Sequence, residues 1–186
     1  PINTIVSFGL KEDDEDQVLA SGNHFYSSPR LSPDSNTIAW LTWNHPNMPW
    51  DGTELWISKL KANGSVEHPE LVAGGINESI FQPEWSPDGI LHFVSDRTKW
   101  WNLYGLIDGQ IDHLAKKDFE FGRPQWKFGM STYSFLSTNQ IICSYIKNGI
   151  SHLAILDTKK RNLESCDVPY TQIKNVKAES GRVVFI

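Results

Sequence analysis

The sequence contains little that would support a metal or redox centre. Its two cysteines, Cys143 and Cys166, do not form a CxxC pair, and its six histidines lack the spacing of metal ligands. We therefore expect neither a metal ion nor a cofactor. Two thiols without a disulfide pattern favour a reducing compartment, so we expect a cytoplasmic protein.

Long apolar runs and basic clusters are also missing. No stretch approaches the roughly 20 apolar residues that cross a bilayer. The 22 acidic residues outnumber the 17 basic ones, and Lys and Arg form no cluster of the kind that binds nucleic acids. We therefore expect no membrane and no nucleic-acid partner. The acidic run Glu12–Asp16 is expected to be a solvated turn. The first residue is Pro1 rather than Met, which suggests a fragment and leaves the presence of a leader peptide open.

What the sequence does contain is a repeated motif. The stretch Pro29–Asp34 (PRLSPD) recurs as Pro83–Asp88 (PEWSPD), and weaker copies begin at Pro124 and Lys174. The copies follow one another after about 40 to 55 residues, which is the length of a four-stranded propeller blade with variable loops. The eight Trp residues are expected to pack repeatedly between such blades.

The clearest repeat, Phe81–Ala115, contains four short β-prone segments. One turn, Ser86–Gly89, joins the first two segments, and another, Asp108–Gly109, joins the last two. Pro and Gly at these positions favour turn conformations. No segment has the capped, 3.6-residue apolar period of a helix. The sequence therefore predicts an all-β fold, a partial β-propeller of TolB- or WD40-like four-stranded antiparallel blades.

The chain is predicted to supply about four blades' worth of sheet, as three complete blades and two half blades. The predicted units are a half blade at 1–22, blades at 25–75, 78–116 and 119–168, and a half blade at 170–186. The third blade is expected to begin with a strand at Arg123–Lys127. The half blades are expected to contain strands at Asn3–Leu10, Gln17–Ala20, Thr171–Ala178 and Arg182–Ile186.

The two half blades have complementary strand deficits. The first lacks its inner strands and the second lacks its outer strands. One hypothesis is that they combine into one blade and close a four-bladed ring. The alternatives are an open arc, or pairing of half blades between two molecules, which would give a homodimer.

Five stretches of the sequence resemble a known family. They are Phe25–Asp34, Trp40–Trp56, Phe81–Gly89, Val94–Tyr104 and Phe121–Trp126. Together they resemble the propeller domain of prolyl oligopeptidase family serine peptidases, in the branch of the acylaminoacyl-peptidases and dipeptidyl-aminopeptidases. The Ser-Pro-Asp-Gly turn is shared with TolB-type propellers, whereas the loop Asn44–Gly52 is much more specific.

The resemblance implies a larger parent protein. Family members carry an α/β-hydrolase domain beside a propeller of seven or eight blades, and that domain holds a Ser-Asp-His triad with the serine in a Gly-x-Ser-x-Gly turn. The expected partners are therefore a hydrolase domain of the same parent chain and a peptide substrate. This chain alone is not expected to be an enzyme.

The nearest match to a nucleophilic serine inside the chain is Ser131. It lies in Gly129–Tyr133 (GMSTY), where the second glycine of the motif is missing and no helix follows. We therefore expect no catalytic residue here.

The best functional candidate is the long loop Asn44–Gly52. Long loops on a rigid scaffold are where function concentrates. The residues expected to contact substrate or the hydrolase domain are His45, Asn47, Met48, Trp50 and Asp51. The alternative is that Met48 and Trp50 simply pack over the neighbouring blade.

The corresponding connection in the next blade supplies the remaining candidates, Arg97, Trp100, Trp101 and Asn102. An arginine there could hold a peptide carboxylate by a bidentate pair. The alternative is that Arg97 pairs with Asp96 or Asp88 while the two Trp residues wedge between blades. The Trp residues assigned to the core between blades are Trp40, Trp56, Trp85 and Trp126.

Three functions compete at this point. The first is a non-catalytic propeller part that shapes or gates peptide access to a hydrolase domain. The second is a protein-interaction scaffold of the TolB or WD40 kind. The third is a carbohydrate-binding propeller, because exposed Trp side chains can stack on sugars.

Overall fold

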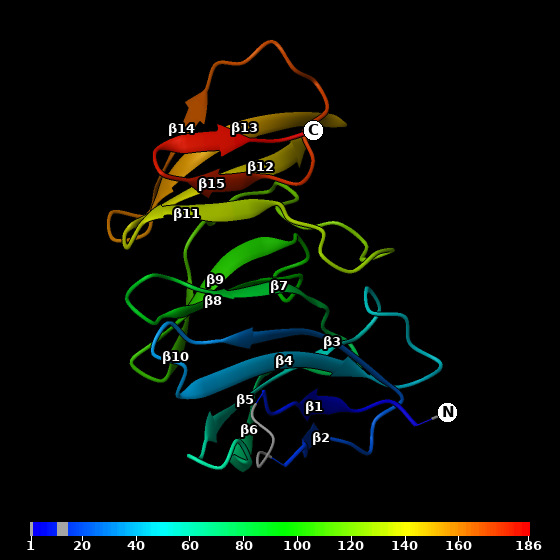
Figure 1. The fold of residues 1–186 in the computed structure, drawn as a ribbon. Helices are drawn as coiled ribbons and strands as arrows, with labels where there is room; N and C mark the ends of the chain where they lie inside the picture. The colour runs from blue at the N-terminus through cyan, green and yellow to red at the C-terminus, as the bar shows by residue number, and fades with distance from the viewer. Residues whose placement is uncertain (1, 11–14) are drawn as a thin grey trace.

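The computed structural model describes residues 2–10 and 15–186, where strands are the only regular elements. Figure 1 shows these strands as a stack of sheets. Three sheets have four strands and two have two strands, and neighbouring strands run antiparallel. The arrangement confirms the predicted all-β class with four-stranded blades. No helix in the described ranges is long and apolar enough to cross a membrane. Residues 12–14 of the expected acidic turn lie outside those ranges.

Each full blade contains strands that are consecutive in the sequence. The first contains β3 (Phe25–Leu31), β4 (Thr37–Trp43), β5 (Glu54–Leu60) and β6 (Val66–Gly74). The second contains β7 (Ile80–Trp85), β8 (Leu91–Ser95), β9 (Asn102–Ile107) and β10 (Gln110–His113). The third contains β11 (Tyr133–Ser137), β12 (Gln140–Lys147), β13 (Ile150–Asp157) and β14 (Asn162–Cys166). The half blades are β1 (Ile5–Ser7) with β2 (Gln17–Ala20), and β15 (Lys177–Glu179) with β16 (Arg182–Val184).

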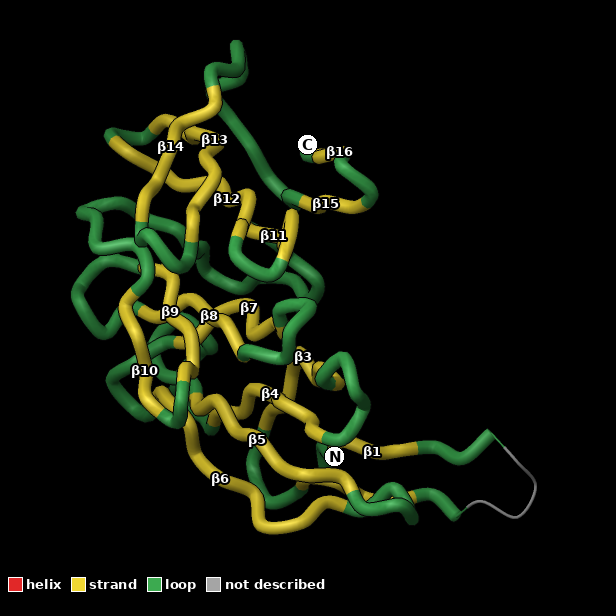
Figure 2. The backbone as a smooth tube through the Cα atoms, turned by 90° about the vertical axis from the view of Figure 1, so that its left-hand side faces the viewer, coloured by secondary structure: helices red, strands yellow, loops and turns green. Residues whose placement is uncertain are grey.

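The sheets form an open arc. The sheet β1–β2 lies at one end of the stack and the sheet β15–β16 at the other, as Figures 1 and 2 both show. These two sheets are separate and share no strand pairing. The hypothesis of a four-bladed ring closed within one chain is therefore wrong for this structure. The sheets pack face to face in sequence order, which keeps the first and the last far apart.

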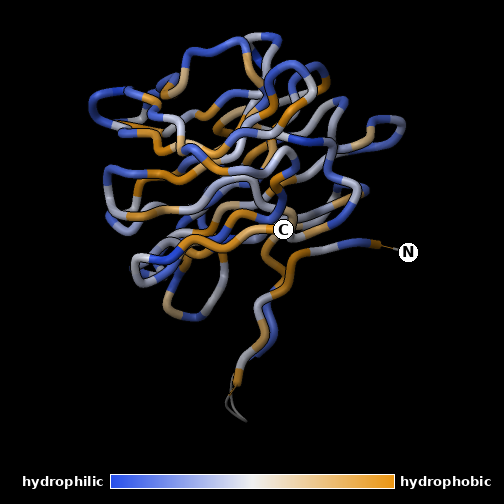
Figure 3. The backbone as a smooth tube through the Cα atoms, turned by 90° about the horizontal axis from the view of Figure 1, so that it is seen from above, coloured by the Kyte–Doolittle hydropathy of each residue, from blue (hydrophilic) through white to orange (hydrophobic). Residues whose placement is uncertain are grey.

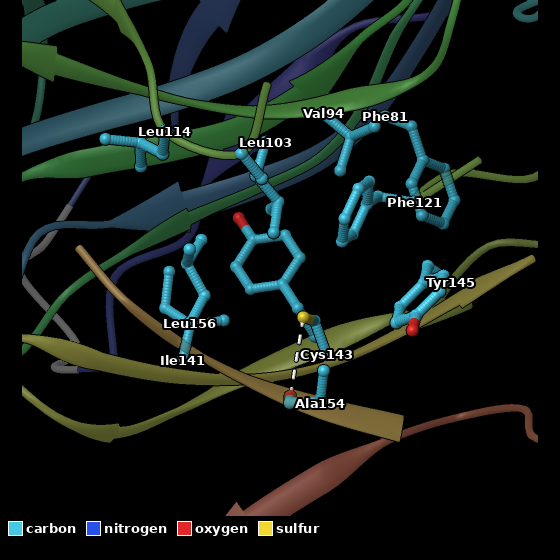
Figure 4. Packing of buried hydrophobic residues seen from close by; sticks show 12 residues of the cluster. Phe81, Val94, Leu103, Leu114, Phe121, Ile141, Cys143, Tyr145, Ala154 and Leu156 are labelled. Atoms are coloured by element: carbon cyan, nitrogen blue, oxygen red, sulfur yellow. Dashed lines mark hydrogen bonds between the residues drawn. The ribbon is translucent and has the colours of Figure 1, made fainter. Parts of the chain in front are cut away.

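Apolar clusters between neighbouring sheets hold the stack together. One cluster joins the first two blades around Leu41, Leu55 and Phe93. Another joins the second and third blades around Phe81 and Phe121, and is drawn in Figure 4. Two smaller clusters attach the half blades. Figure 3 colours the backbone by hydropathy and shows hydrophilic residues in many of the loops at the edges. Each large apolar side chain buried in this way stabilises the fold by about 1.5–3 kcal/mol.

The repeated Ser-Pro-Asp motif forms the turn between the first two strands of a blade. In the first blade the Ser32 hydroxyl donates to Asp34 Oδ1 at 2.5 Å and accepts from the Thr37 N–H at 2.9 Å. In the second blade Ser86 donates to Asp88 Oδ1 at 2.6 Å and accepts from the Ile90 N–H at 3.0 Å. The serine and aspartate recur because together they close the turn locally.

The third blade departs from the predicted layout. The expected strand at Arg123–Lys127 is wrong, because its first strand is β11 and residues 122–131 form a loop. Trp126 is 73% exposed instead of lying in the core between blades. The physical reason is that the buried Tyr133 of β11 supplies the apolar anchor that the innermost strand needs. Gln125 in the loop donates instead to Ser27 Oγ of the first blade at 3.3 Å.

Among the half-blade strands, β2 has the predicted bounds Gln17–Ala20, whereas β1, β15 and β16 are shorter than predicted. Most of the stretch Thr171–Ala178 is irregular, and only its end joins β15. The pairing nevertheless continues past the strand ends, because Lys174 and Ile186 exchange two backbone hydrogen bonds of 2.7 and 2.8 Å. Strand β1 covers only the middle of the expected Asn3–Leu10.

Candidate functional site

The long connections of neighbouring blades emerge at one edge of the stack, which we call the loop rim. It consists of residues 44–53, 75–79, 96–101 and 114–132. Because strands within a blade alternate in direction, the connections after its second and fourth strands leave from the same edge. In Figure 1 the connections β4–β5 and β10–β11 extend on the right-hand side. The opposite edge, the turn rim, carries tight turns such as the Ser-Pro-Asp ones.

Ser79 joins the two loops that the sequence singled out. Its hydroxyl donates to the Pro49 carbonyl at 2.8 Å, in the loop of the first blade. Its N–H donates to Asp96 Oδ1 at 2.8 Å, at the start of the second loop. Burial raises the pKa of Asp96, and the Ser79 N–H opposes that shift. The two loops are therefore held in one framework by a buried serine.

The side chains of the first loop divide into structural and exposed groups. Asn47 Nδ2 donates to the Ile76 carbonyl at 2.9 Å, and Asp51 Oδ2 accepts from the Met48 N–H at 2.9 Å. These two polar residues therefore hold the loop in shape. The His45 side chain is exposed, and Met48 is 46% exposed. Only His45, Met48 and Trp50 remain available for a ligand.

Trp50 contacts a residue that the sequence placed elsewhere. Its ring lies 4.2 Å from the ring of Trp126, centroid to centroid, with the planes tilted by 43°. Phe128 in the same loop is 70% exposed. The loop rim therefore displays an aromatic pair made of Trp50 and Trp126, whereas Phe128 lies beside Val6 and Tyr26. Sequence reasoning missed Trp126 as a site residue. The preceding Pro124 gave no warning, because the corresponding Pro29 and Pro83 lie within β3 and β7.

Arg97 has a carboxylate partner of its own. Its Nε and Nη2 donate to the two Glu78 carboxylate oxygens at 2.9 and 3.2 Å. Its guanidinium also lies 5.5 Å from the Tyr104 ring centroid. The expected pairing with Asp96 or Asp88 is therefore wrong, since Glu78 fills that place. A bidentate partner also makes Arg97 a poor binder of an additional carboxylate.

Trp101 and Asn102 have structural roles. The Trp101 N–H donates to Glu120 Oε2 at 2.9 Å, and its ring covers Gly122 so closely that a Cβ there would lie 1.8 Å from a ring carbon. Asn102 is buried and bonds both the carbonyl and the N–H of Lys117. Trp101 thus wedges between blades, as the structural alternative predicted. Trp100 remains 39% exposed.

Ser131 is a buried structural residue. Its hydroxyl donates to the Val176 carbonyl at 2.5 Å and to the Tyr133 carbonyl at 3.1 Å. It also accepts from Gln82 Nε2 at 3.3 Å. A nucleophilic serine needs an adjacent base and access to substrate, and this hydroxyl has carbonyl and amide neighbours instead. Within the described residues, no group of three or more His, Cys, Asp or Glu could hold a metal ion.

Solved structures place this geometry in a family. Puromycin hydrolase, crystallised as an S511A mutant with PGG, matches with a TM-score of 0.85 and 34% identity. A puromycin-hydrolyzing peptidase of Mycobacterium tuberculosis matches with a TM-score of 0.84 and 32% identity. Each match covers 91% of this chain and 26% of the other. Puromycin hydrolase is a prolyl oligopeptidase family peptidase. The chain is a propeller segment of the prolyl oligopeptidase family.

More distant structures share the fold of this propeller segment. Prolyl oligopeptidase B from Galerina marginata matches with a TM-score of 0.64 at 11% identity, over 88% of the segment and 23% of that chain. A TolB from Agrobacterium tumefaciens matches with a TM-score of 0.52 at 11% identity, over 76% of the segment and 48% of that chain. No protein-family model and no curated protein matches the segment. The propeller segment spans about a quarter of the length of its puromycin-hydrolysing relatives.

Proposed function

We propose that this propeller segment shapes peptide access to an α/β-hydrolase domain carried elsewhere in the same parent chain. The observation that carries the proposal is the aromatic pair Trp50 and Trp126 on the loop rim, with Trp126 73% exposed. Exposed aromatic residues grouped on a rigid scaffold are typical of binding surfaces. The relatives are hydrolases much longer than this segment, which supports a catalytic domain outside it.

The proposal assigns no chemistry to the segment itself. Ser131 is the serine whose sequence context comes nearest to that of a nucleophile. It is buried, and its hydroxyl donates hydrogen bonds to backbone carbonyls. The purified segment should therefore leave chromogenic aminoacyl and acyl-peptide substrates intact. Turnover that Ser131→Ala abolishes would contradict this assignment.

The parent-length protein provides the direct test. Trp126→Ala should lower kcat/KM for peptides of several residues more than for a single aminoacyl substrate, because only the longer ligand would reach the loop rim. The matched control is Phe8→Ala, since Phe8 is 72% exposed and lies on the β1–β2 connection. Equal effects of the two variants on both substrate classes would count against the proposal.

Two other functions predict different results. An interaction scaffold would retain a partner unrelated to any hydrolase in a pull-down, and Trp126→Ala would release that partner. A carbohydrate-binding propeller would give a signal on a glycan array. Pairing of half blades between two molecules would appear as a dimer in light scattering.

A further inference from the structure

A second feature of the loop rim lies between the third blade and the C-terminal half blade. It is a cavity of about 470 Å³ formed where the connection β10–β11 meets the residues before β15. Its lining includes Arg123, Trp126, Lys127, Met130 and Lys174. Trp126 thus borders this cavity and also contacts Trp50.

The charged residues of this cavity are all cationic. Arg123, Lys127 and Lys174 line it, and no carboxylate does. The chain as a whole has a formal net charge of −5, so a cavity with only positive charge is unusual for this sequence. The cavity between the first two blades, by contrast, is lined by Lys59 together with Glu67 and Glu70. A cavity lined by one sign of charge attracts a ligand of the opposite sign.

Arg123 is held in place without a carboxylate partner. Its Nη2 donates to the Ile173 carbonyl at 2.8 Å and to Ser151 Oγ at 3.3 Å. Among the described residues, other arginines reach carboxylates: Arg30 reaches Glu84, Arg97 reaches Glu78, and Arg161 reaches Asp112. Arg123 forms no such pair within the described part of the chain. Its guanidinium is thus positioned by neutral groups and can bind an anion.

Burial adds a reason for an anion to bind. Desolvation lowers the pKa of Arg123 because the half-buried cation has lost part of its water. An incoming carboxylate would replace the lost water with charge-assisted hydrogen bonds, and Arg can form two of them with one carboxylate. The walls from Trp126 and Met130 are apolar, so they suit a ligand whose carboxylate is next to an apolar side chain.

We propose that this cavity binds the C-terminal carboxylate of a peptide, with Arg123 as the main contact and Lys127 and Lys174 as supporting charges. The identity of the ligand as a peptide rests on the proposed function, whereas the anion site rests on the cavity itself. In the parent protein this site would fix one end of a peptide at the loop rim. Trp126 would then contact the same peptide.

Calorimetric titration of the full chain with small peptides tests the assignment. The probes are Ala-Ala-Phe, its C-terminal amide, the amide of Ala-Glu-Phe, and inorganic phosphate. Ala-Ala-Phe should bind at least about tenfold more tightly than its amide, because a hydrogen bond to a charged group is worth roughly that factor or more. Arg123→Gln should weaken the acid about tenfold or more, and Lys127→Gln or Lys174→Gln by about two- to fivefold.

The controls separate a binding defect from a folding defect. Lys160→Gln is the matched charge control, because the Lys160 side chain is 80% exposed on the turn β13–β14. It should leave affinity unchanged. Arg123→Lys keeps the positive charge and should lose only part of the affinity, and a thermal melt should show both Arg123 variants folded. If Arg123→Gln fails to fold, the two lysine variants and the acid–amide pair still decide the outcome.

Three outcomes would overturn the proposal. The first is equal affinity for Ala-Ala-Phe and its amide. The second is tight binding of the amide of Ala-Glu-Phe, which would assign the site to side-chain carboxylates. The third is binding of phosphate without binding of the peptide acid. If any of these occurs while Trp126→Ala still alters peptide kinetics in the parent protein, the cavity assignment falls and the proposed function stands.

Discussion

The rings of Trp50 and Trp126 lie 4.2 Å apart, although one belongs to the loop of the first blade and the other to the loop that precedes the third. The contact therefore links the first and third blades along the loop rim without involving the second blade. Gln125 supports the same bridge by donating to Ser27 Oγ. The loop at 122–131 is therefore a strap between blades that are not neighbours in sequence.

The exposure of Trp126 predicts a small effect on stability. Trp126→Ala should lower the free energy of unfolding by about 0.5–1.5 kcal/mol, because only the aromatic pair and part of one ring face are lost. Trp40→Ala should cost about 3–5 kcal/mol, because Trp40 is buried against the first half blade. Urea denaturation of the two variants measures the difference. Equal losses would mean that Trp126 lies in the core after all.

The contact between Gly122 and the Trp101 ring predicts a steric effect. Gly122→Ala should lower the free energy of unfolding by about 1–3 kcal/mol, because the ring must move to admit the methyl group. Gly105→Ala is the control, since a Cβ there would have its nearest neighbour at 3.5 Å. That variant should change stability by less than about 0.5 kcal/mol. If Gly122→Ala leaves the free energy of unfolding unchanged, the Trp101 ring does not lie over Gly122.

Gln82 connects the inner strands of the second and third blades. Its amide donates to the Tyr133 carbonyl at 2.8 Å and accepts from the Thr132 N–H at 2.7 Å. Gln82→Leu should lower the free energy of unfolding by about 1–3 kcal/mol, because the buried Thr132 N–H loses its partner and the Tyr133 carbonyl keeps only the Ser131 hydroxyl. The exposed Gln110 offers the control Gln110→Leu, which should have little effect. Thermal melting of both variants, compared at one pH, gives the answer.

Buried His92 predicts a loss of stability at mildly acidic pH. Burial lowers its pKa below the ordinary value of 6.5, although the Ile90 carbonyl and Asp88 oppose the shift. The unfolded chain therefore binds the proton more readily, and stability falls as the pH drops from about 6.5 toward the folded-state pKa. His92→Gln should flatten this part of the stability curve. The half-buried His113, with a pKa lowered in the same direction, should leave a residual slope. Parallel curves for the variant and the original chain would contradict the assignment.

The fold was predictable where local signals agreed. The Ser-Pro-Asp turns and the Asp108–Gly109 turn located the first two blades, since each turn closes through bonds within a few residues. The third blade lacks this turn, and its first strand was assigned to the wrong stretch. Tyr133 is recognisable as a core residue only from its long-range bond to the Gln82 carbonyl, which the sequence does not reveal.

The candidate site was predictable only as a location. The loop Asn44–Gly52 does lie on the loop rim, but the pairing of Arg97 with Glu78 and of Trp50 with Trp126 depends on neighbouring connections. Arg123 gave no sequence signal at all. Its importance comes from the charges that are absent around it, which only the folded arrangement shows.

The two edges of the stack differ in how they could accept new sequence. Turns on the turn rim are closed by their own residues, so a reporter peptide inserted at Asp108–Gly109 would leave the rest of the chain's bonds in place. The loop rim is fastened from blade to blade through Ser79 and the strap at 122–131. An insertion there would separate loops that are joined to one another by hydrogen bonds. We therefore expect the turn rim to tolerate inserted sequence and the loop rim not to tolerate it.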